Sequence, residues 1–405
     1  MRHLLLLFLL GGCFGQSDIP SGPTDATVLF AVGTPPPQDN NCNGKVSHYI
    51  GSVAFNANKA YAVSLQFTSQ QCGGDSGANQ LASYSEISLN SGVKPLGQIE
   101  SDMSSLPRLA ANDGLITVTS HMNQITLGPD IGAWTNPAGT FGPVAAVADT
   151  TTLWTIGIQQ ASGGAAESNN PNYPCCGPPP VSTMASFVKF VLPTPTGPIA
   201  MPVTPLCTYA TMASCLVQNS THLIYSASSM TSGVSIRMFP KTGTMASQER
   251  EIGTITGTNS SVPVGLAADE QTVVWAVSPI TGNFPPPSTH CTVFAYILAT
   301  QETAMLLDTS KFSCKDVDVR ADQVYFAIVG TESENGNQEM FGRGIGRIAI
   351  ASKTFESIDT SVFGYGAGIR RVHISQDGET FFGIDPYAMA RFSAHSLDGK
   401  QEIAK

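Results

Sequence analysis

A short strand module recurs seven times along the chain, and this repeat constrains the fold more than any other feature. Each copy starts with Asp or Asn, continues through one or two turn residues, and ends in a strand rich in β-branched and aromatic residues. The starts lie 36 to 70 residues apart, which is wider than a single hairpin and typical of repeat architectures. They are Asn58, Asp113, Asp149, Asn219, Asp269, Asp322 and Asp377.

Alternating stretches flank these copies on both sides. KDVDVRAD (315–322) and RRVHISQD (370–377) come before two of them, and a second alternating pair follows each copy after a loop. The order strand, tight turn, strand, loop, strand, turn, strand gives four antiparallel strands per unit, which is the blade of a β-propeller. The sequence therefore predicts an all-β fold with four-stranded antiparallel blades. Seven blades fit the spacing best, six to eight are compatible with it, and a pair of β-sandwiches is the alternative. Residues 27–33 (TVLFAVG) are expected to close the ring with the last blade.

The last copy, HISQDGETFFGID, resembles the corresponding strand of YVTN and NHL-type propellers, and VGLAADEQTVVWAV is similar to it. No repeat of this chain ends in the Trp-Asp dipeptide that is typical of WD40 repeats. The resemblance covers residues 46–405 and implies the fold, whereas it says little about activity.

The first thirteen residues, MRHLLLLFLLGGC, have the order of a signal peptide: a positive start, a short apolar run and then small residues. The run is too short to span a bilayer, which needs about 20 residues. Leu10-Gly11-Gly12-Cys13 resembles the lipobox of bacterial lipoproteins, which implies that Cys13 becomes lipidated. We therefore expect a signal peptide at 1–12, a lipid-anchored tether at 13–24 and the propeller at 25–405. The expected location is the bacterial cell envelope, at the outer membrane; an ordinary signal peptide, and hence secretion, is the alternative.

Cysteine parity fits this interpretation, because eight cysteines remain once Cys13 is set aside. An even number in an exported chain predicts four disulfides. Cys42–Cys72 and Cys291–Cys314 are the expected bridges, and the pairing of the other four stays open. The eight are Cys42, Cys72, Cys175, Cys176, Cys207, Cys215, Cys291 and Cys314.

Long segments between second and third strands would lie on one face of a propeller, together with the connections between blades. They are residues 34–44, 69–83, 159–182, 279–291 and 331–346. Most of the cysteines fall in this layer, so disulfides would fix the shape of its loops. A rigid, looped face of this kind is suited to a protein or glycan partner.

Catalytic motifs find little support. Gly74-Asp75-Ser76-Gly77 resembles the nucleophile block of trypsin-like proteases, but no upstream His stands in the required context. The histidines are isolated and the cysteines lack C-x₂-C spacing, so no metal or other cofactor is expected. Asp149, Asp269, Asp322 and Asp377 precede strands as turn caps do, which favours a turn role over calcium binding.

Charge excludes one further class of partner. The net charge is −10 and no Lys/Arg run occurs, so nucleic-acid binding is not expected. The predicted function is a non-catalytic binding or scaffold module that contacts the membrane only through its lipid. The alternative is a secreted propeller enzyme, a lyase or glycan hydrolase, with its site at the channel mouth. Its obvious acids would be the loop carboxylates Asp75, Glu167, Glu332 and Glu334.

Overall fold

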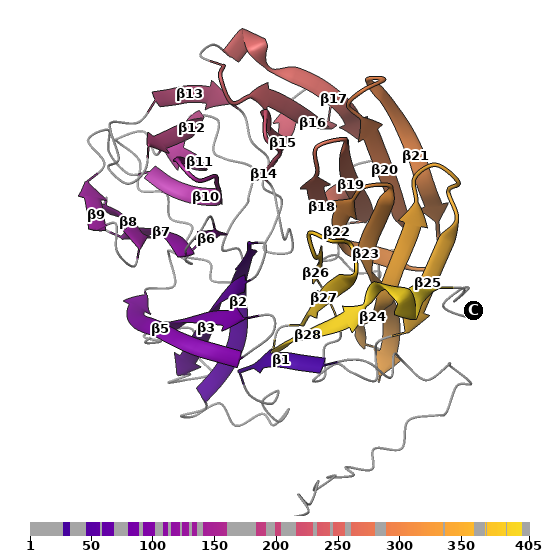
Figure 1. Ribbon diagram of the computed structural model, residues 1–405, viewed down its shortest axis with the longest axis horizontal. Helices are drawn as coiled ribbons and strands as arrows, with labels where there is room; N and C mark the ends of the chain where they lie inside the picture. Colours follow the sequence, from indigo (N-terminus) through magenta and orange to yellow (C-terminus); the bar gives the residue numbers. More distant parts are fainter. Residues whose placement is uncertain are drawn as a thin grey trace, which may run out of the picture.

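Within the residues that it describes, the computed structural model has seven four-stranded antiparallel sheets. They are arranged around a central axis (Figure 1). The residues that the structure describes are 27–32, 46–56, 59–68, 80–88, 92–101, 108–111, 115–121, 124–128, 132–135, 141–159, 184–191, 199–203, 216–229, 233–243, 246–255, 261–279, 289–334, 337–359, 369, 371–385 and 387–398.

Six of the sheets are simple meanders whose strands follow chain order. The inner, first strands of all seven sheets are β2 (Val46–Phe55), β6 (Arg108–Ala111), β10 (Phe141–Ala148), β14 (Leu216–Gln218), β18 (Ser261–Ala268), β22 (Ser313–Arg320) and β26 (Arg371–Ile374). The second strands are β3 (Lys59–Thr68), β7 (Leu115–His121), β11 (Thr152–Gln159), β15 (His222–Ser229), β19 (Thr272–Pro279), β23 (Gln323–Glu334) and β27 (Thr380–Ile384). The third strands are β4 (Gln80–Ser88), β8 (Gln124–Gly128), β12 (Met184–Val191), β16 (Gly233–Pro240), β20 (Cys291–Ile297), β24 (Asn337–Ala349) and β28 (Ala388–Ser393). The fourth are β5 (Gly92–Ser101), β9 (Gly132–Thr135), β13 (Ile199–Val203), β17 (Arg250–Ile255), β21 (Glu302–Thr309) and β25 (Phe355–Asp359).

The last sheet takes its fourth strand from the other end of the chain. β1 (Thr27–Ala31) pairs antiparallel with β28, from Thr27 opposite Arg391 to Ala31 opposite Ala388. This confirms the expectation that the TVLFAVG segment closes the ring. The seven predicted module strands are also confirmed, because each of them forms the second strand of a sheet.

Asp and Asn side chains hold most of the described tight turns between first and second strands. Asp149 Oδ1 accepts the backbone N–H of Thr152 at 2.9 Å, and Asp269 Oδ1 accepts that of Thr272 at 2.8 Å. Asn219 caps its turn in the same way through His222. These bonds confirm the turn role, since a short polar side chain replaces the backbone acceptor that the tight turn lacks.

In the first sheet Asn56 caps the turn, since its Oδ1 accepts from the Lys59 backbone N–H. One turn prediction needs correction, because Asp322 is not a cap of this kind. It follows Ala321, which has a φ of 53°, in a two-residue turn between Arg320 and Gln323, and its side chain accepts from the Gln323 side chain.

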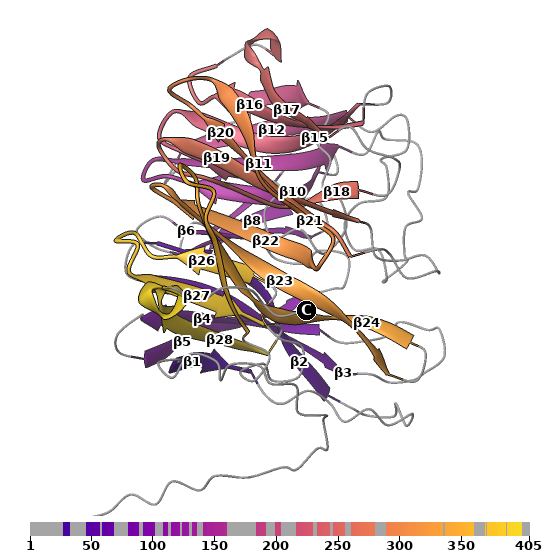
Figure 2. The same cartoon turned by 90° about the vertical axis from the view of Figure 1, so that its right-hand side faces the viewer.

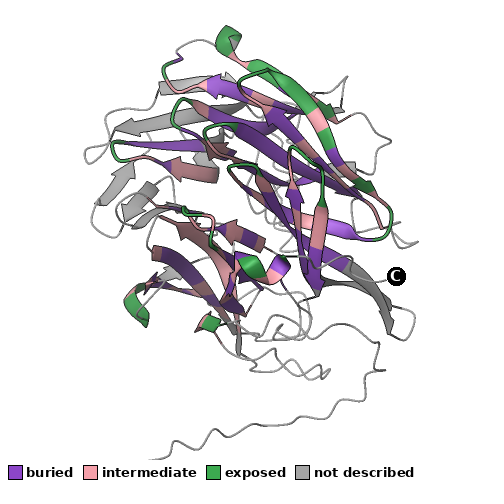
Figure 3. Ribbon diagram, turned by 45° about the vertical axis from the view of Figure 1, so that its right-hand side comes forward, coloured by how far each residue is buried: buried purple, intermediate pink, exposed green. Residues whose placement is uncertain are grey.

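The hydrophobic core is divided into layers between neighbouring sheets. One cluster joins Val264 and Val274 to Val317 and Phe326, and another joins Ile345 to Phe381 and Phe392. Burial therefore follows the sheet faces, as Figure 3 shows, with exposed residues gathered at turns and outer strands. Because each layer is apolar on both sides, burial of these faces holds adjacent sheets together.

Inner strands approach closely where Gly265 faces β22. A Cβ built on Gly265 would lie 2.6 Å from the Val317 nitrogen and 2.8 Å from the Asp316 Cα. These are backbone atoms, which cannot swing aside as a side chain can. The glycine therefore sets how near β18 can lie to β22.

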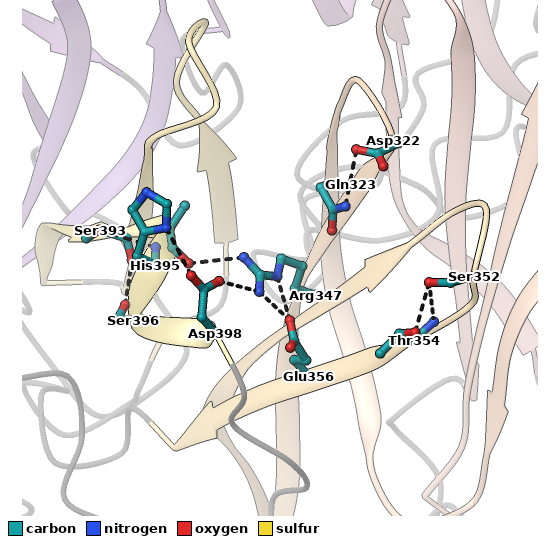
Figure 4. Close-up of polar contacts among 11 residues, drawn as sticks. Asp322, Gln323, Arg347, Ser352, Thr354, Glu356, Ser393, His395, Ser396 and Asp398 are labelled. Atoms are coloured by element: carbon teal, nitrogen blue, oxygen red, sulfur yellow. Dashed lines mark hydrogen bonds and ion pairs between the residues drawn. The ribbon is translucent and has the colours of Figure 1, made fainter.

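A polar cluster fastens the C-terminal end to the neighbouring sheet (Figure 4). Arg347 in β24 pairs with Glu356 in β25 and lies 2.7 Å from Asp398, which follows the 3₁₀ helix Ala394–Leu397. His395 lies 3.0 Å from both Asp398 and Glu379, and these carboxylates raise the pKa of its imidazole. The cluster ties the end of the last sheet to the outer strands of the sixth.

The segment 331–346 was expected to be a loop, and this was wrong. β23 and β24 pair as far as Glu334 opposite Asn337, with one register shift between Ile328 and Val329, and Figure 2 shows β24 reaching beyond the other strands on one side. The two residues between them in the sequence are Asn335-Gly336, the dipeptide favoured in two-residue hairpins. The loop expectation had not used this dipeptide signal.

We predict that Gly265→Ala destabilises the protein, by about 1–3 kcal/mol as for other overpacked sites. Urea unfolding followed by tryptophan fluorescence would measure the change. Ala321→Gly is the matched control, because relief of a positive φ should leave stability equal or higher. Equal stability of Gly265→Ala and the wild type would contradict the close-approach argument.

Candidate functional site

Seven equivalent positions on the inner strands follow the central channel. Six of them are the second ladder pair from the tight turn that joins the first and second strands, and Asp318 is the third pair from its turn. In five sheets the residue is alanine or valine, whereas the sixth and seventh sheets supply a carboxylate and an imidazole. The seven residues are Ala54, Ala110, Val147, Val217, Ala267, Asp318 and His373. The polar groups thus gather on one side of the channel.

Two aspartates of β22 bond to the backbone of β26. Asp316 Oδ2 accepts the Val372 N–H at 3.1 Å, and Asp318 Oδ2 accepts the Ile374 N–H at 2.9 Å. These amides are on the edge of β26 that does not face β27, where a sheet would leave them without an acceptor. The carboxylates therefore substitute for a neighbouring strand.

His373 completes this group. Its Nδ1 lies 2.7 Å from Asp318 Oδ2, and its ring stacks on Phe55 with centroids 3.9 Å apart. Since Asp318 Oδ2 is an acceptor that already receives the Ile374 N–H, Nδ1 carries the proton and donates. The other ring nitrogen, Nε2, has no partner among the described residues. About a third of the side chain is exposed, at 33%.

Asp316 is buried more deeply, with 4% of its surface exposed. Desolvation raises the pKa of its carboxyl to about 8, and Arg371, whose positive charge acts in the opposite direction, limits the rise. At neutral pH the protonated form is therefore favoured, and its hydrogen bond from Val372 requires only the acceptor oxygen.

A cavity of about 200 Å³ lies among these groups. Val53, Val217 and Leu266 contribute apolar surface, and Phe55 contributes its ring. The polar part of the lining is Asp316, Asp318, Arg371 and His373. Phe55 and Ala268, which also line it, are the last residues of β2 and β18, so the cavity lies near the turn ends of these inner strands.

The other end of the inner strands carries a disulfide. Cys291 at the start of β20 is bonded to Cys314 near the start of β22, in the next sheet. Both residues are fully buried, at 0% exposed. The expected Cys291–Cys314 bridge is confirmed, although both residues lie in strands and not in loops or connections. We call this end the loop face, because second strands end and third strands begin there.

Hydrogen bonds fix the base of one loop-face segment around this disulfide. Ser278 Oγ donates to the His290 carbonyl at 2.7 Å and accepts the Cys314 N–H at 3.0 Å. Thr289 donates to the Ser310 carbonyl at 2.6 Å, and His290 Nε2 lies 2.9 Å from Asp308. The two ends of the segment between Pro279 and Thr289 are therefore held to each other and to the next sheet.

Most site residues named from the sequence lie outside the described residues. These are the lipidation candidate Cys13, the loop acids Asp75 and Glu167, and Cys42, Cys72, Cys175, Cys176, Cys207 and Cys215. Glu332 and Glu334 lie in β23, opposite Glu339 and Asn337.

The channel residues were missed, although the sequence holds a signal for them. Aligning KDVDVRAD with RRVHISQD places Asp316 against Arg371 and Asp318 against His373, so two successive repeats carry opposite charges at the same two positions. His373 was regarded only as an isolated histidine. In the described part of the chain, no three His, Cys, Asp or Glu side chains are grouped to hold a metal ion.

No family model matches the chain, and no curated protein matches it. Solved structures share its shape at low identity. The WD40 domain of Pan2 from Neurospora crassa is 10% identical, with 96% of this chain and 99% of that chain covered and a TM-score of 0.51. An acylaminoacyl peptidase from Pyrococcus horikoshii is 12% identical, with 89% and 52% covered and a TM-score of 0.48. The β-propeller domain of the trilobed protease from Pyrococcus furiosus is 12% identical, with 88% and 94% covered and a TM-score of 0.45.

The protein is a β-propeller. Its repeated four-stranded sheets, their arrangement around a channel and the likeness to the Pan2 domain agree on this class. At such low identity the likeness shows the fold alone, and propellers carry both binding and enzymatic functions. Among the residues described, no helix is long and apolar enough to cross a membrane.

We predict that Asp316→Asn alters how stability depends on pH. The pKa of Asp316 is raised from 3.8 to about 8 on folding, so within that window the folded state binds a proton that the unfolded chain has lost. Its contribution to stability therefore falls as pH rises from about 4 to 8, and the asparagine variant should lack this fall.

Urea midpoints measured across this pH range would test the prediction. The informative quantity is the difference between wild type and Asp316→Asn, with Asp322→Asn, an exposed turn variant, as control. A difference that stays constant with pH would contradict the argument.

Proposed function

We propose that the protein is an exported, lipid-anchored β-propeller that acts as a non-catalytic binding or scaffold module. Its partner, a protein or a glycan, would bind at the loop face. The observation that carries this proposal is the Cys291–Cys314 bridge, which joins two neighbouring sheets at that face. A surface whose supports are already fixed loses less conformational entropy on binding, and this favours recognition.

The channel groups have a structural role. Asp316 and Asp318 accept backbone amides of β26, and Asp318 also accepts from His373. Their first contribution is to join the sixth and seventh sheets. Removing them would disturb the fold before it affected any chemistry.

The enzyme alternative has one observation in its favour. Asp318 orients His373 so that Nε2 is left for another molecule, which is the arrangement of a general base and its orienting carboxylate. Release of new reducing ends or of unsaturated products from polysaccharides, lost in His373→Gln, would favour a glycan hydrolase or lyase.

The proposed anchor predicts that wild-type protein made in a bacterium incorporates an alkyne-labelled palmitate and sediments with membranes. Cys13→Ser should lose the label and appear in the soluble fraction, because the variant has no thiol to acylate. Cys72→Ser is the control and should keep the label. An unlabelled wild-type protein would remove the anchor from the proposal.

The loop-face proposal predicts selective binding on glycan and envelope-protein arrays. Cys291→Ala/Cys314→Ala should lose about 3 kcal/mol of stability, given the 23-residue separation, and should bind at least tenfold more weakly under conditions where it stays folded. Asp322→Asn, at a tight turn on the opposite end of the sheets, should bind like the wild type. Unchanged binding by a folded double variant would place the partner elsewhere.

A further inference from the structure

The imidazole of His373 brings a hydrogen-bond acceptor to the channel cavity. His373 lines the cavity, and its Nδ1 donates to Asp318 at 2.7 Å. A neutral imidazole that carries its proton on Nδ1 has an acceptor at Nε2. Among the described residues, the side chain otherwise stacks on Phe55 and Phe382, and neither of these rings can donate to Nε2. The acceptor is therefore left for a donor group of another molecule.

The charged side chains around this imidazole already have partners in the protein. Asp318 accepts two backbone N–H groups, at 2.8 and 2.9 Å, in addition to His373. Asp316 accepts the Val372 N–H at 3.1 Å, and the positive charge of Arg371 acts on its carboxyl. A charged ligand would have to displace these contacts or would lack a counter-charge, which is costly away from water. An uncharged donor meets neither difficulty.

Apolar side chains from three sheets line the cavity beside the imidazole. They are Val53, Val217 and Leu266. Phe55 adds its ring, whose centroid lies 3.9 Å from that of His373. Contact with such surfaces favours a hydrocarbon ring or chain. Because ligand sites combine apolar walls with a few placed polar groups, this lining is suited to a molecule with one donor group and an apolar body.

Volume limits the size of that molecule. The cavity measures about 200 Å³. An engineered protein cavity of roughly 150 Å³ holds one benzene ring, so a single ring or a short chain fits here. A hydroxyl group supplies the donor with one heavy atom, which leaves most of the volume for the apolar part.

We propose that this cavity binds a small uncharged hydroxyl compound with a single ring or a short chain. Its O–H donates to Nε2 of His373, and its apolar part lies against Val53, Val217 and Leu266. The site does not depend on the loop-face proposal, and it lies toward the opposite end of the inner strands.

Isothermal titration of the full-length protein with phenol tests the proposal at about pH 8, where an unperturbed imidazole is neutral. Anisole, benzoate and benzylamine are the comparisons. Each has one ring, but anisole cannot donate a hydrogen bond and the other two are charged. Phenol should bind about tenfold more tightly than any of the three. Equal affinity for phenol and anisole, or tighter binding of either charged compound, would overturn the proposal.

The variant His373→Phe keeps an aromatic ring beside Phe55 but removes Nε2. It should bind phenol no more tightly than anisole, because the preference depends on the acceptor. A purely structural role of His373 would weaken both ligands alike and leave their ratio unchanged, which would count against the proposal. His395→Gln is the matched control, since it changes an exposed histidine that pairs with Glu379 and Asp398, and it should keep the preference.

A crystal of the wild-type protein with 4-bromophenol keeps the proposal falsifiable if the variant fails to fold. Anomalous scattering should place bromine among Val53, Val217 and Leu266, with the hydroxyl oxygen within hydrogen-bond distance of Nε2 of His373. Bromine bound elsewhere, a hydroxyl turned away from Nε2, or no bromine in the cavity at saturating 4-bromophenol would each show that the proposed site is wrong.

Discussion

The pairing of β1 with β28 is the constraint on which the rest of the structure depends. Sheets that pack face to face around an axis need a closed ring, since an open ring would leave two apolar faces in water. Here the last sheet combines the two ends of the chain, from Thr27 opposite Arg391 to Ala31 opposite Ala388. The Val32 N–H, bonded to the Tyr387 carbonyl at 2.9 Å, extends the contact by one residue.

Once the ring is closed, each inner strand has an edge that faces a neighbouring inner strand and not a sheet partner. At Gly265 the lack of a side chain lets the backbone of β22 approach β18 closely. Between β22 and β26, the carboxylates of Asp316 and Asp318 accept backbone N–H groups on the edge of β26 that lacks a strand partner. A second role follows from this, because groups that join two sheets also place charge beside the channel cavity.

The sequence predicted the local elements well, because each of them depends on nearby residues. The seven module strands, the caps at Asp149 and Asp269 and the closing strand at 27–33 follow from alternation and turn chemistry. Asp316 could not be placed in this way. Its partner is the backbone N–H of Val372, 56 residues away, and the only sequence signal for it is the comparison of two repeats that aligns Asp316 with Arg371. The β23–β24 hairpin was missed because the Asn-Gly signal at 335–336 was not used.

The closing strand has a mechanical consequence. A lipid at Cys13 would place any pull from the membrane on the segment that leads directly into β1. β1 is the outermost strand of its sheet, is only five residues long and pairs with β28. Tension on the anchor would therefore act first on the β1–β28 pairing that closes the ring, and only then on the apolar layers between the other sheets. In such a molecule, the strength of attachment to the membrane and the integrity of the propeller share one set of backbone hydrogen bonds.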